Sequence, residues 1–294
     1  MKFVTCSYKG KELAGILSNN GKDFYPLSAF GCAEESLNAF IRRDGMHRFS
    51  DWEEQLASKT ADVVPLNQIK LLAPIPEPAQ DILCLGVNFM AHAEESARFK
   101  KEAFANDRKD TVYFSKRVNR AVADGDSIDG HFDIVDSLDY EAELAVIIGK
   151  NAFQVSEADA FSYVFGYTIL NDVSARNLQT RHKQWYFGKS LDGFCPMGPW
   201  IVTADAFEKP PRLAIRSRIN GELRQDSTTA LFITGIARAI SELSQGITLK
   251  AGTILAMGTP AGVGMGFTPP KFLKSGDIVE CEIEGIGKLT NPVK

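Results

Sequence analysis

Beyond residue 80 the sequence consists mostly of strand patterns, and the scarcity of helices there limits the folds that the chain can adopt. Short apolar runs with β-branched residues, such as DILCLGVN at 81–88 and DYEAELAVIIGK at 139–150, predict strands. RLAIRSRINGELRQ at 212–225 predicts a hairpin, and one clear helix is predicted over 231–244, where apolar residues recur at helical spacing. Because helices and strands do not alternate regularly, the pattern disfavours a doubly wound parallel sheet and a TIM barrel.

A proline-rich segment divides the chain. LLAPIPEPAQD at 71–81 contains three prolines, which fix φ and lack an N–H donor, so it cannot continue a helix or a central strand. The sequence before it predicts a hairpin at Asn20-Gly21 and two helices, over 33–43 and after Ser50. We therefore predict a small N-terminal α+β domain at 1–72 and a larger domain at 73–294.

Charge and cysteine usage exclude several classes of function. The 33 basic and 37 acidic residues give a net charge of −4, which offers no attraction for nucleic acid or an anionic membrane. Apolar runs stay well short of the roughly 20 residues of a membrane helix, and the first residues do not resemble a signal peptide, so a cytoplasmic protein is expected. The five cysteines are scattered without a CxxC pair, which predicts reduced, buried thiols.

Two carboxylates precede the most apolar strand. Glu141 and Glu143 are two residues apart, so on a strand they project from one face. The residues that follow, 144–148, are all apolar, as in a strand buried on both faces, where two like charges need a neutralising partner such as a divalent cation. An edge strand whose first residues stay in water is the alternative.

A third carboxylate ends another predicted strand. VFGYTILND at 164–172 ends in Asp172, and three carboxylates suit Mg²⁺ or Mn²⁺, which prefer oxygen ligands, better than zinc. Asp172 could instead cap a following helix.

His92 and Glu95 lie three residues apart in GVNFMAHAEES. On a helix they share a face, so Glu95 could orient one ring nitrogen and leave the other free for proton transfer. A solvated surface histidine is the alternative.

Two further segments suggest anion binding. Lys189 lies among aromatic residues, glycines and prolines, a setting that could hold its ammonium group toward an anion, although the local sequence by itself favours a surface lysine. AMGTPAGVGMGFTPP at 256–270 is a glycine-rich loop whose amides and Thr259 hydroxyl could bind a carboxylate, or it could be a structural turn. It matches neither a P-loop nor a dinucleotide-binding motif.

These motifs resemble the fumarylacetoacetate hydrolase family when they are taken in order. GVNFMAHAEE, DYEAELAVIIGK, GYTILNDVSARNLQ, GKSLDGFCPMGP and GTPAGVG occur in the family's order and approximate spacing over about residues 70–294. The chain is most similar to bacterial members related to acylpyruvate hydrolases and oxaloacetate decarboxylases. The resemblance implies an α+β fold, a mixed, β-rich roll of mainly antiparallel sheets with few helices, and a homodimer.

The resemblance also implies roles for individual residues. Glu141, Glu143 and Asp172 match the ligands of Mg²⁺ or Mn²⁺, and His92 and Glu95 match the catalytic dyad, on a segment that often closes over ligand. The remaining matches are the substrate-facing Lys189, the glutamine Gln179 that contacts the reacting group, and the carboxylate-binding Thr259.

The expected activity is cleavage of small 2-oxo acids through an enolate that a divalent cation stabilises. Oxaloacetate decarboxylation as a lyase and acylpyruvate C–C hydrolysis are the leading reactions. The alternatives are an isomerase or decarboxylase of hydroxymuconate-type diacids, similar to 2-hydroxyhepta-2,4-diene-1,7-dioate isomerase, and a non-catalytic metabolite-binding protein. A serine hydrolase is disfavoured because the chain has no GxSxG motif.

Overall fold

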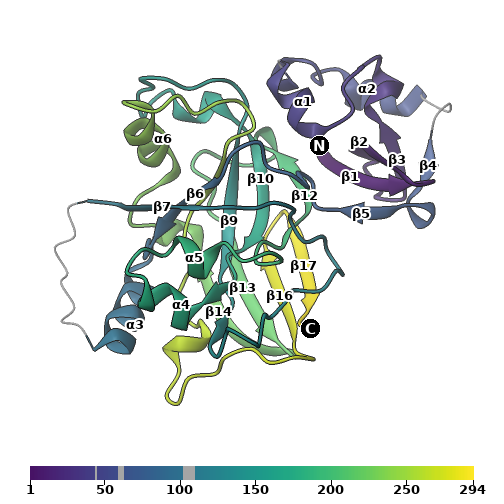
Figure 1. The fold of residues 1–294 in the computed structure, drawn as a ribbon. Coiled ribbons are helices and arrows are strands. Elements are labelled where there is room, and N and C mark those ends of the chain that lie inside the picture. The colour runs from purple at the N-terminus through teal and green to yellow at the C-terminus, as the bar shows by residue number, and fades with distance from the viewer. Residues whose placement is uncertain (44, 59–62, 102–109) are drawn as a thin grey trace.

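A computed structural model describes residues 1–43, 45–58, 63–101 and 110–294 (Figure 1). The strands are β1 Lys2–Tyr8, β2 Lys11–Leu17, β3 Asp23–Pro26, β4 Val64–Pro65, β5 Lys70–Leu72, β6 Ile82–Gly86, β7 Val112–Lys116, β8 Leu138–Asp139, β9 Ala142–Ile148, β10 Val164–Asn171, β11 Ser174–Ala175, β12 Met197–Thr203, β13 Ala214–Ile219, β14 Glu222–Thr228, β15 Ile254–Ala256, β16 Ile278–Ile283 and β17 Gly287–Pro292. The α-helices are α1 Leu37–Arg42, α2 Trp52–Ser58, α3 Met90–Lys100, α4 Arg176–Arg181, α5 Tyr186–Lys189 and α6 Ile236–Ser244.

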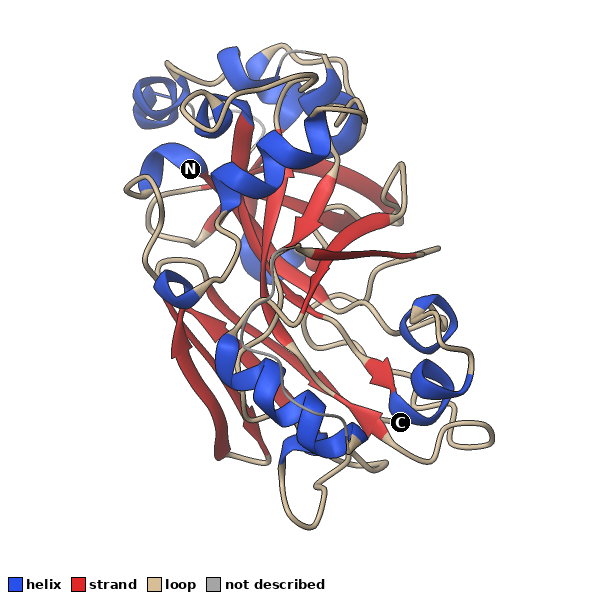
Figure 2. Ribbon diagram, turned by 90° about the vertical axis from the view of Figure 1, so that its left-hand side faces the viewer, coloured by secondary structure: helices blue, strands red, loops and turns tan. Residues whose placement is uncertain are grey.

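One large sheet organises the described part of the chain. Its strand order is β4-β3-β2-β1-β12-β10-β9-β15-β6-β7, with β5 paired to β1 beside this path. β15 pairs with β6 in parallel, and the neighbouring pairs β9–β10 and β10–β12 are antiparallel. A separate four-stranded sheet has the order β14-β13-β16-β17 and ends near the C-terminus (Figures 1 and 2). This arrangement confirms the predicted α+β class with mainly antiparallel sheets.

The central strand β9 is buried on both faces, as the apolar run predicts. Its residues Leu144, Val146 and Ile148 belong to the core that also contains side chains of the four-stranded sheet. The alternate residues Ala145 and Ile147 belong to a second core, shared with the N-terminal elements. The same strand therefore separates two hydrophobic cores and carries carboxylates at its N-terminal end.

The N-terminal region extends the main sheet. β1 pairs with β12 through Lys2↔Val202 and Phe3↔Ile201, so residues 1–72 and the rest of the chain share one set of backbone hydrogen bonds. In Figure 1 these elements lie at one end of the molecule, with α1 and α2 on the far side from α3. The division into domains at 72/73 stays a prediction.

The predicted long helix is shorter than expected. We predicted a helix over 231–244, but α6 begins at Ile236. Leu231 ends a short 3-10 helix, Thr229–Leu231, and the chain bends at Ile233 and Thr234. These two residues cannot join α6 because Ile233 N–H donates to the Asn88 carbonyl and Thr234 N–H donates to Asn88 Oδ1. Tertiary hydrogen bonds thus override the helical spacing. The N-terminal helix is also shorter than 33–43, because Ser36 caps α1 by accepting from Ala39 N–H.

Other local predictions are confirmed. Asn220 and Gly221 both have positive φ and form the turn between β13 and β14. All five cysteines are free and buried. No helix in the described ranges is long and apolar enough to cross a membrane.

Residues 102–109, part of the segment expected to close over ligand, lie outside the described residues.

An aromatic cluster joins the N-terminal elements to the main sheet. The ring of Phe165 on β10 lies with its centroid 5.1 Å from Phe3, 5.8 Å from Phe49 and 6.5 Å from Phe40. Phe3, Phe40 and Phe165 are buried, so this cluster contributes to both the sheet and the packing of α1.

We expect Phe165→Ala to lower the free energy of unfolding by about 3–5 kcal/mol, because it leaves a cavity in this cluster. Phe153→Ala, whose ring is 54% exposed, is the control and should change it by less than about 0.5 kcal/mol. Guanidinium denaturation followed by tryptophan fluorescence measures both. Similar small losses for the two variants would contradict a structural role for the cluster.

Candidate metal centre and active-site pocket

Three buried carboxylates converge where β9 begins and β10 ends. Glu141 directly precedes β9 and Glu143 lies on it, while Asp172 directly follows β10, which pairs with β9 through Leu170↔Glu143 and Asn171↔Ala142. Each of the three acids offers an oxygen within 4.8 Å of the others. The antiparallel pairing therefore brings together the three acids that the sequence predicts as metal ligands, and their burial excludes the water-exposed edge strand.

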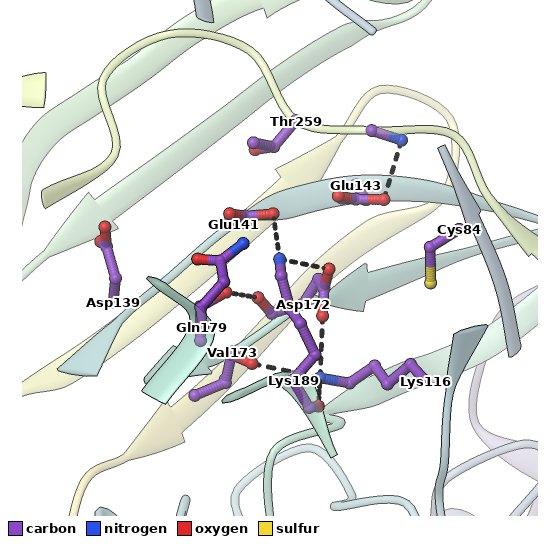
Figure 3. A network of polar contacts seen from close by, with 12 residues as sticks. Cys84, Lys116, Asp139, Glu141, Glu143, Asp172, Val173, Gln179, Lys189 and Thr259 are labelled. Atoms are coloured by element: carbon purple, nitrogen blue, oxygen red, sulfur yellow. Dashed lines mark hydrogen bonds and ion pairs between the residues drawn. The ribbon is translucent and has the colours of Figure 1, made fainter. Parts of the chain in front are cut away.

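Two buried lysines contact these acids. Lys189, at the end of α5, places Nζ 2.8 Å from Glu141 Oε2 and 2.6 Å from Asp172 Oδ2, as Figure 3 shows. Lys116, at the end of β7, lies 2.8 Å from Asp172 Oδ1 and donates to the carbonyls of Val173 and Lys189. Lys189 is thus held toward anions, as predicted, but here the anions are carboxylates of the protein itself.

Arg176 and Asp139 extend the network on the other side of Glu141. Arg176, the first residue of α4, donates from Nε to Asp139 at 2.9 Å and contacts Glu141 Oε1 through Nη1 at 2.7 Å. Its Nη1 also donates to Gln179 Oε1, whereas Nη2 is buried without a hydrogen-bond partner among the described residues. Because α4 is capped at Ala175, Asp172 is not the helix cap that was its alternative role.

The balance of charge fits a hard divalent cation. Three buried cations, Lys116, Arg176 and Lys189, meet four buried carboxylates, so one negative charge is in excess when all four acids are ionised. Burial and the neighbouring charges of Asp172 and Glu141 raise the pKa of Glu143 well above its usual value. Burial also acts to raise the pKa of Glu141, but Lys189 and Arg176 outweigh it and lower that pKa. An all-oxygen donor set with excess negative charge suits Mg²⁺ or Mn²⁺.

Glu141 and Glu143 line a pocket with an empty volume of about 450 Å³, and Asp172 lies behind Lys189, which also lines it. Its polar lining includes His92, Arg176, Gln179, Lys189 and Thr259 in addition to Glu141 and Glu143. Its outer part is lined by the aromatic rings of Phe99, Phe114 and Trp185 and by Lys100. The structure therefore gathers seven of the eight predicted site residues around or beneath one small cavity, and the eighth, Glu95, contacts His92.

His92 and Glu95 share one face of α3. His92 Nδ1 lies 3.5 Å from Glu95 Oε2, and His92 is buried, which excludes a solvated surface histidine. No described residue forms a hydrogen bond with this Nδ1. Glu95 itself accepts from Gly262 N–H at 2.9 Å, so the backbone of the glycine-rich loop fixes the carboxylate. The two side chains thus lie side by side as the spacing predicts, without a hydrogen bond between them, and their catalytic role stays a prediction.

The glycine-rich loop binds carboxylates of the protein. Gly258 N–H donates to Glu143 at 2.8 Å, and Gly264 and Met265 N–H donate to Asp139 at 2.6 and 3.0 Å. The Thr259 hydroxyl donates to the Ala142 carbonyl and accepts from Gln225. We expected these amides and this hydroxyl to be open to a substrate carboxylate, but in this structure the protein's own acceptors engage them. The role of Thr259 in substrate binding stays a prediction.

Sequence reasoning missed three charged members of the network. Lys116, Asp139 and Arg176 are absent from the predicted site, although Asp139 and Arg176 lie inside two of the motifs that carry the family resemblance. Asp139 precedes the predicted ligand Glu141 by two residues, and Arg176 follows the predicted ligand Asp172 by four. This spacing was the sequence signal that could have placed both of them near the site. Lys116 carried no local signal, because only the pairing of β7 with β6 brings it beneath Asp172.

Comparisons with known proteins agree with this geometry. A family model described as fumarylacetoacetate (FAA) hydrolase C-terminal matches residues 81–294. Oxaloacetate tautomerase YisK of Bacillus subtilis (strain 168) is 46% identical over 308 residues, covering 100% of both chains.

Two solved structures extend the likeness to three dimensions. Fumarylacetoacetate hydrolase (EaFAH) from psychrophilic Exiguobacterium antarcticum is 38% identical to this chain, and the two structures superpose with a TM-score of 0.83. The match covers 100% of this chain and 99% of the EaFAH chain. The 5-carboxymethyl-2-hydroxymuconate delta-isomerase from Mycobacterium smegmatis is 30% identical with a TM-score of 0.75, at the same coverage.

Glu143→Gln should have opposite effects on cation binding and on stability. It removes a ligand charge, so Mn²⁺ binding measured by calorimetry should weaken by at least about 100-fold. It also removes repulsion from Glu141 and Asp172, so the EDTA-treated variant should melt at a higher temperature than the EDTA-treated parent. Glu94→Gln, an exposed change on α3, should alter neither quantity. Unchanged Mn²⁺ affinity in Glu143→Gln would remove Glu143 from the metal centre.

Asp139→Asn should destabilise the protein, because an amide nitrogen would face N–H donors from Tyr140, Gly264, Met265 and Arg176. We expect a loss of about 2–4 kcal/mol in the free energy of unfolding, measured by denaturant titration. Asp133→Asn, at an exposed position, is the matched control. Equal stability of the two variants would contradict the role assigned to Asp139.

Proposed function

The chain belongs to the fumarylacetoacetate hydrolase family, and from this premise we propose that it is an enzyme that enolises small 2-oxo acids with the help of a divalent cation. Keto–enol interconversion of oxaloacetate is the reaction we favour. The observation that carries the proposal is the buried triad of Glu141, Glu143 and Asp172, of which Glu141 and Glu143 line the same pocket as His92. The full-length likeness to an oxaloacetate tautomerase supports the choice of substrate.

The three acids would hold Mg²⁺ or Mn²⁺. When bound, the cation supplies Lewis-acid stabilisation of negative charge on the keto oxygen of the substrate. Because the buried residues alone carry one excess negative charge when all four acids are ionised, a divalent cation would leave the base of the pocket positive, which favours an anionic substrate.

Arg176 and Lys189 would supply fixed positive charge. Arg176 lines the pocket, and its buried Nη2 has an N–H for which the described residues offer no acceptor, so it is available to a carboxylate or an oxyanion. Burial acts to lower the pKa of Lys189, but Asp172 and Glu141 outweigh it and raise that pKa. Lys189 therefore stays protonated and acts through its charge rather than as a proton donor.

His92 would move the proton. One ring nitrogen takes the proton from carbon 3 of the 2-oxo acid, and the C–H electron pair forms the C2–C3 double bond while negative charge develops on the oxygen at C2. Glu95, 3.5 Å from Nδ1, favours the imidazolium that forms. Return of the proton to that oxygen gives the enol, and return to carbon 3 regenerates the ketone.

The same enolate connects the other predicted reactions. Loss of carbon dioxide from oxaloacetate yields an enolate without removal of a proton from carbon 3, and acylpyruvate hydrolysis requires His92 to activate water instead. The likeness to a hydroxymuconate isomerase favours double-bond migration in related diacids as a second candidate. Decarboxylation, hydrolysis and the homodimer stay predictions.

The test separates proton transfer from cation binding. The cation-loaded protein should accelerate oxaloacetate enolisation, followed by the ultraviolet absorbance of the enol, and EDTA should abolish the acceleration until Mg²⁺ or Mn²⁺ is restored. His92→Ala should lower kcat for enolisation by about 10²- to 10⁴-fold, and should lower decarboxylation less, because that reaction takes no proton from carbon 3.

Glu94→Gln on the exposed side of α3 serves as the control and should keep full activity. Enolisation that survives chelation would overturn the role of the acid triad. Binding of 2-oxo acids without any turnover would instead favour the non-catalytic alternative.

A further inference from the structure

The face of α3 that carries His92 continues along the pocket to its mouth. His92, Ser96, Phe99 and Lys100 all line the pocket, and their spacings of four, three and one residues place them along one side of the helix. Eight residues of α-helix rise about 12 Å, so this face runs from the proposed base to the outer wall. The mechanism above uses His92 and gives Lys100 no part.

The ammonium group of Lys100 lies on an aromatic platform. Its Nζ is 5.3 Å from the centroid of the Trp185 ring, a cation–π distance. The Trp185 ring stacks edge-on against Phe114 at 5.1 Å and packs so closely over Gly86 that a Cβ there would lie 2.8 Å from its Cη2. Because β6 and β7 hold this ring, the position of the cation above it is defined by the sheet.

Charge is distributed unevenly along the pocket. The buried cations and acids lie at its base, Lys100 lies at its mouth, and the rings of Phe99, Phe114 and Trp185 line the wall between them. A ligand that contacts both the buried charges at the base and Lys100 at the mouth therefore needs an anionic 2-oxo acid group, an apolar carbon segment and a second anionic group. A monocarboxylic 2-oxo acid provides only the first of these groups.

We propose that Lys100, seated on Trp185, is a specificity-determining residue that binds the second carboxylate of a dicarboxylic 2-oxo acid. This inference rests on the proposed function, because it assumes that the 2-oxo acid group binds at the base of the pocket. It assigns the preference for diacids to the last turn of α3, away from the residues that carry the chemistry.

The test compares substrates that differ in the second carboxylate. Deuterium exchange at carbon 3, followed by NMR in D₂O, gives kcat/KM for the diacids oxaloacetate and 2-oxoglutarate and for the monoacids pyruvate and 2-oxobutyrate. Lys100→Met should lower kcat/KM for at least one of the two diacids by about 10- to 100-fold, mainly by raising KM. It should change kcat/KM for the two monoacids by less than about twofold. Lys100→Arg should restore most of the loss.

Lys101→Met is the matched control. Lys101 is exposed, follows α3 and does not line the pocket, so the change removes the same charge one residue away and should leave the preference for diacids unchanged. An equal effect of Lys100→Met on diacids and monoacids, or an equal effect of the two variants on diacids, would overturn the assignment.

Calorimetry separates this inference from the proposed function. Titration of the Mn²⁺-loaded protein with 2-oxoglutarate and 2-oxobutyrate gives the ratio of the two dissociation constants for the parent and for Lys100→Met. Absence of exchange with all four acids would overturn the proposed enolisation. A diacid preference in binding that Lys100→Met removes would still support the role of Lys100, and a preference that persists in the variant would exclude it.

Discussion

The pairing of buried charges from distant parts of the chain is the interaction on which the pocket depends. Lys116 comes from the end of β7, Arg176 from the start of α4 and Lys189 from the end of α5, and each contacts a carboxylate supplied by the central strands. Removing one partner of such a pair leaves an uncompensated charge in a dry interior. These contacts therefore fix the positions of both short helices against the sheet, and the arrangement that suits a cation also stabilises the fold around it.

The glycine-rich loop connects the two halves of this site. Its amides hold Glu143 beside the metal centre, Glu95 beside the proposed base, and Asp139 beside Arg176. Gly258 and Gly262 have positive φ, a conformation that side chains disfavour. The loop can thus turn its N–H groups toward three separate carboxylates. A shift of this loop would move the base and the metal ligands together.

Sequence patterns predicted the class of the fold and most of the residues that the structure gathers at the candidate site, because both depend on local chemistry. The apolar run after Glu143 marked the buried strand, and spacing of two and three residues placed Glu141 with Glu143 and His92 with Glu95. Long-range contacts were beyond this reasoning. The start of α6 depends on hydrogen bonds to Asn88, and Lys189 depends on acids that are 17 and 48 residues away. Neither contact leaves a periodic signal.

The pairing of β1 with β12 also affects how the protein is made. Lys2 lies opposite Val202, so β1 meets this neighbour only after β12, far along the sequence, has been synthesised. Until then, only the first part of this edge, at Lys2 and Phe3, lacks a strand partner, because β5 pairs with Thr5, Cys6 and Ser7 on the same edge. Strand pairing between such distant segments forms slowly, so this contact lowers the rate at which the complete sheet assembles.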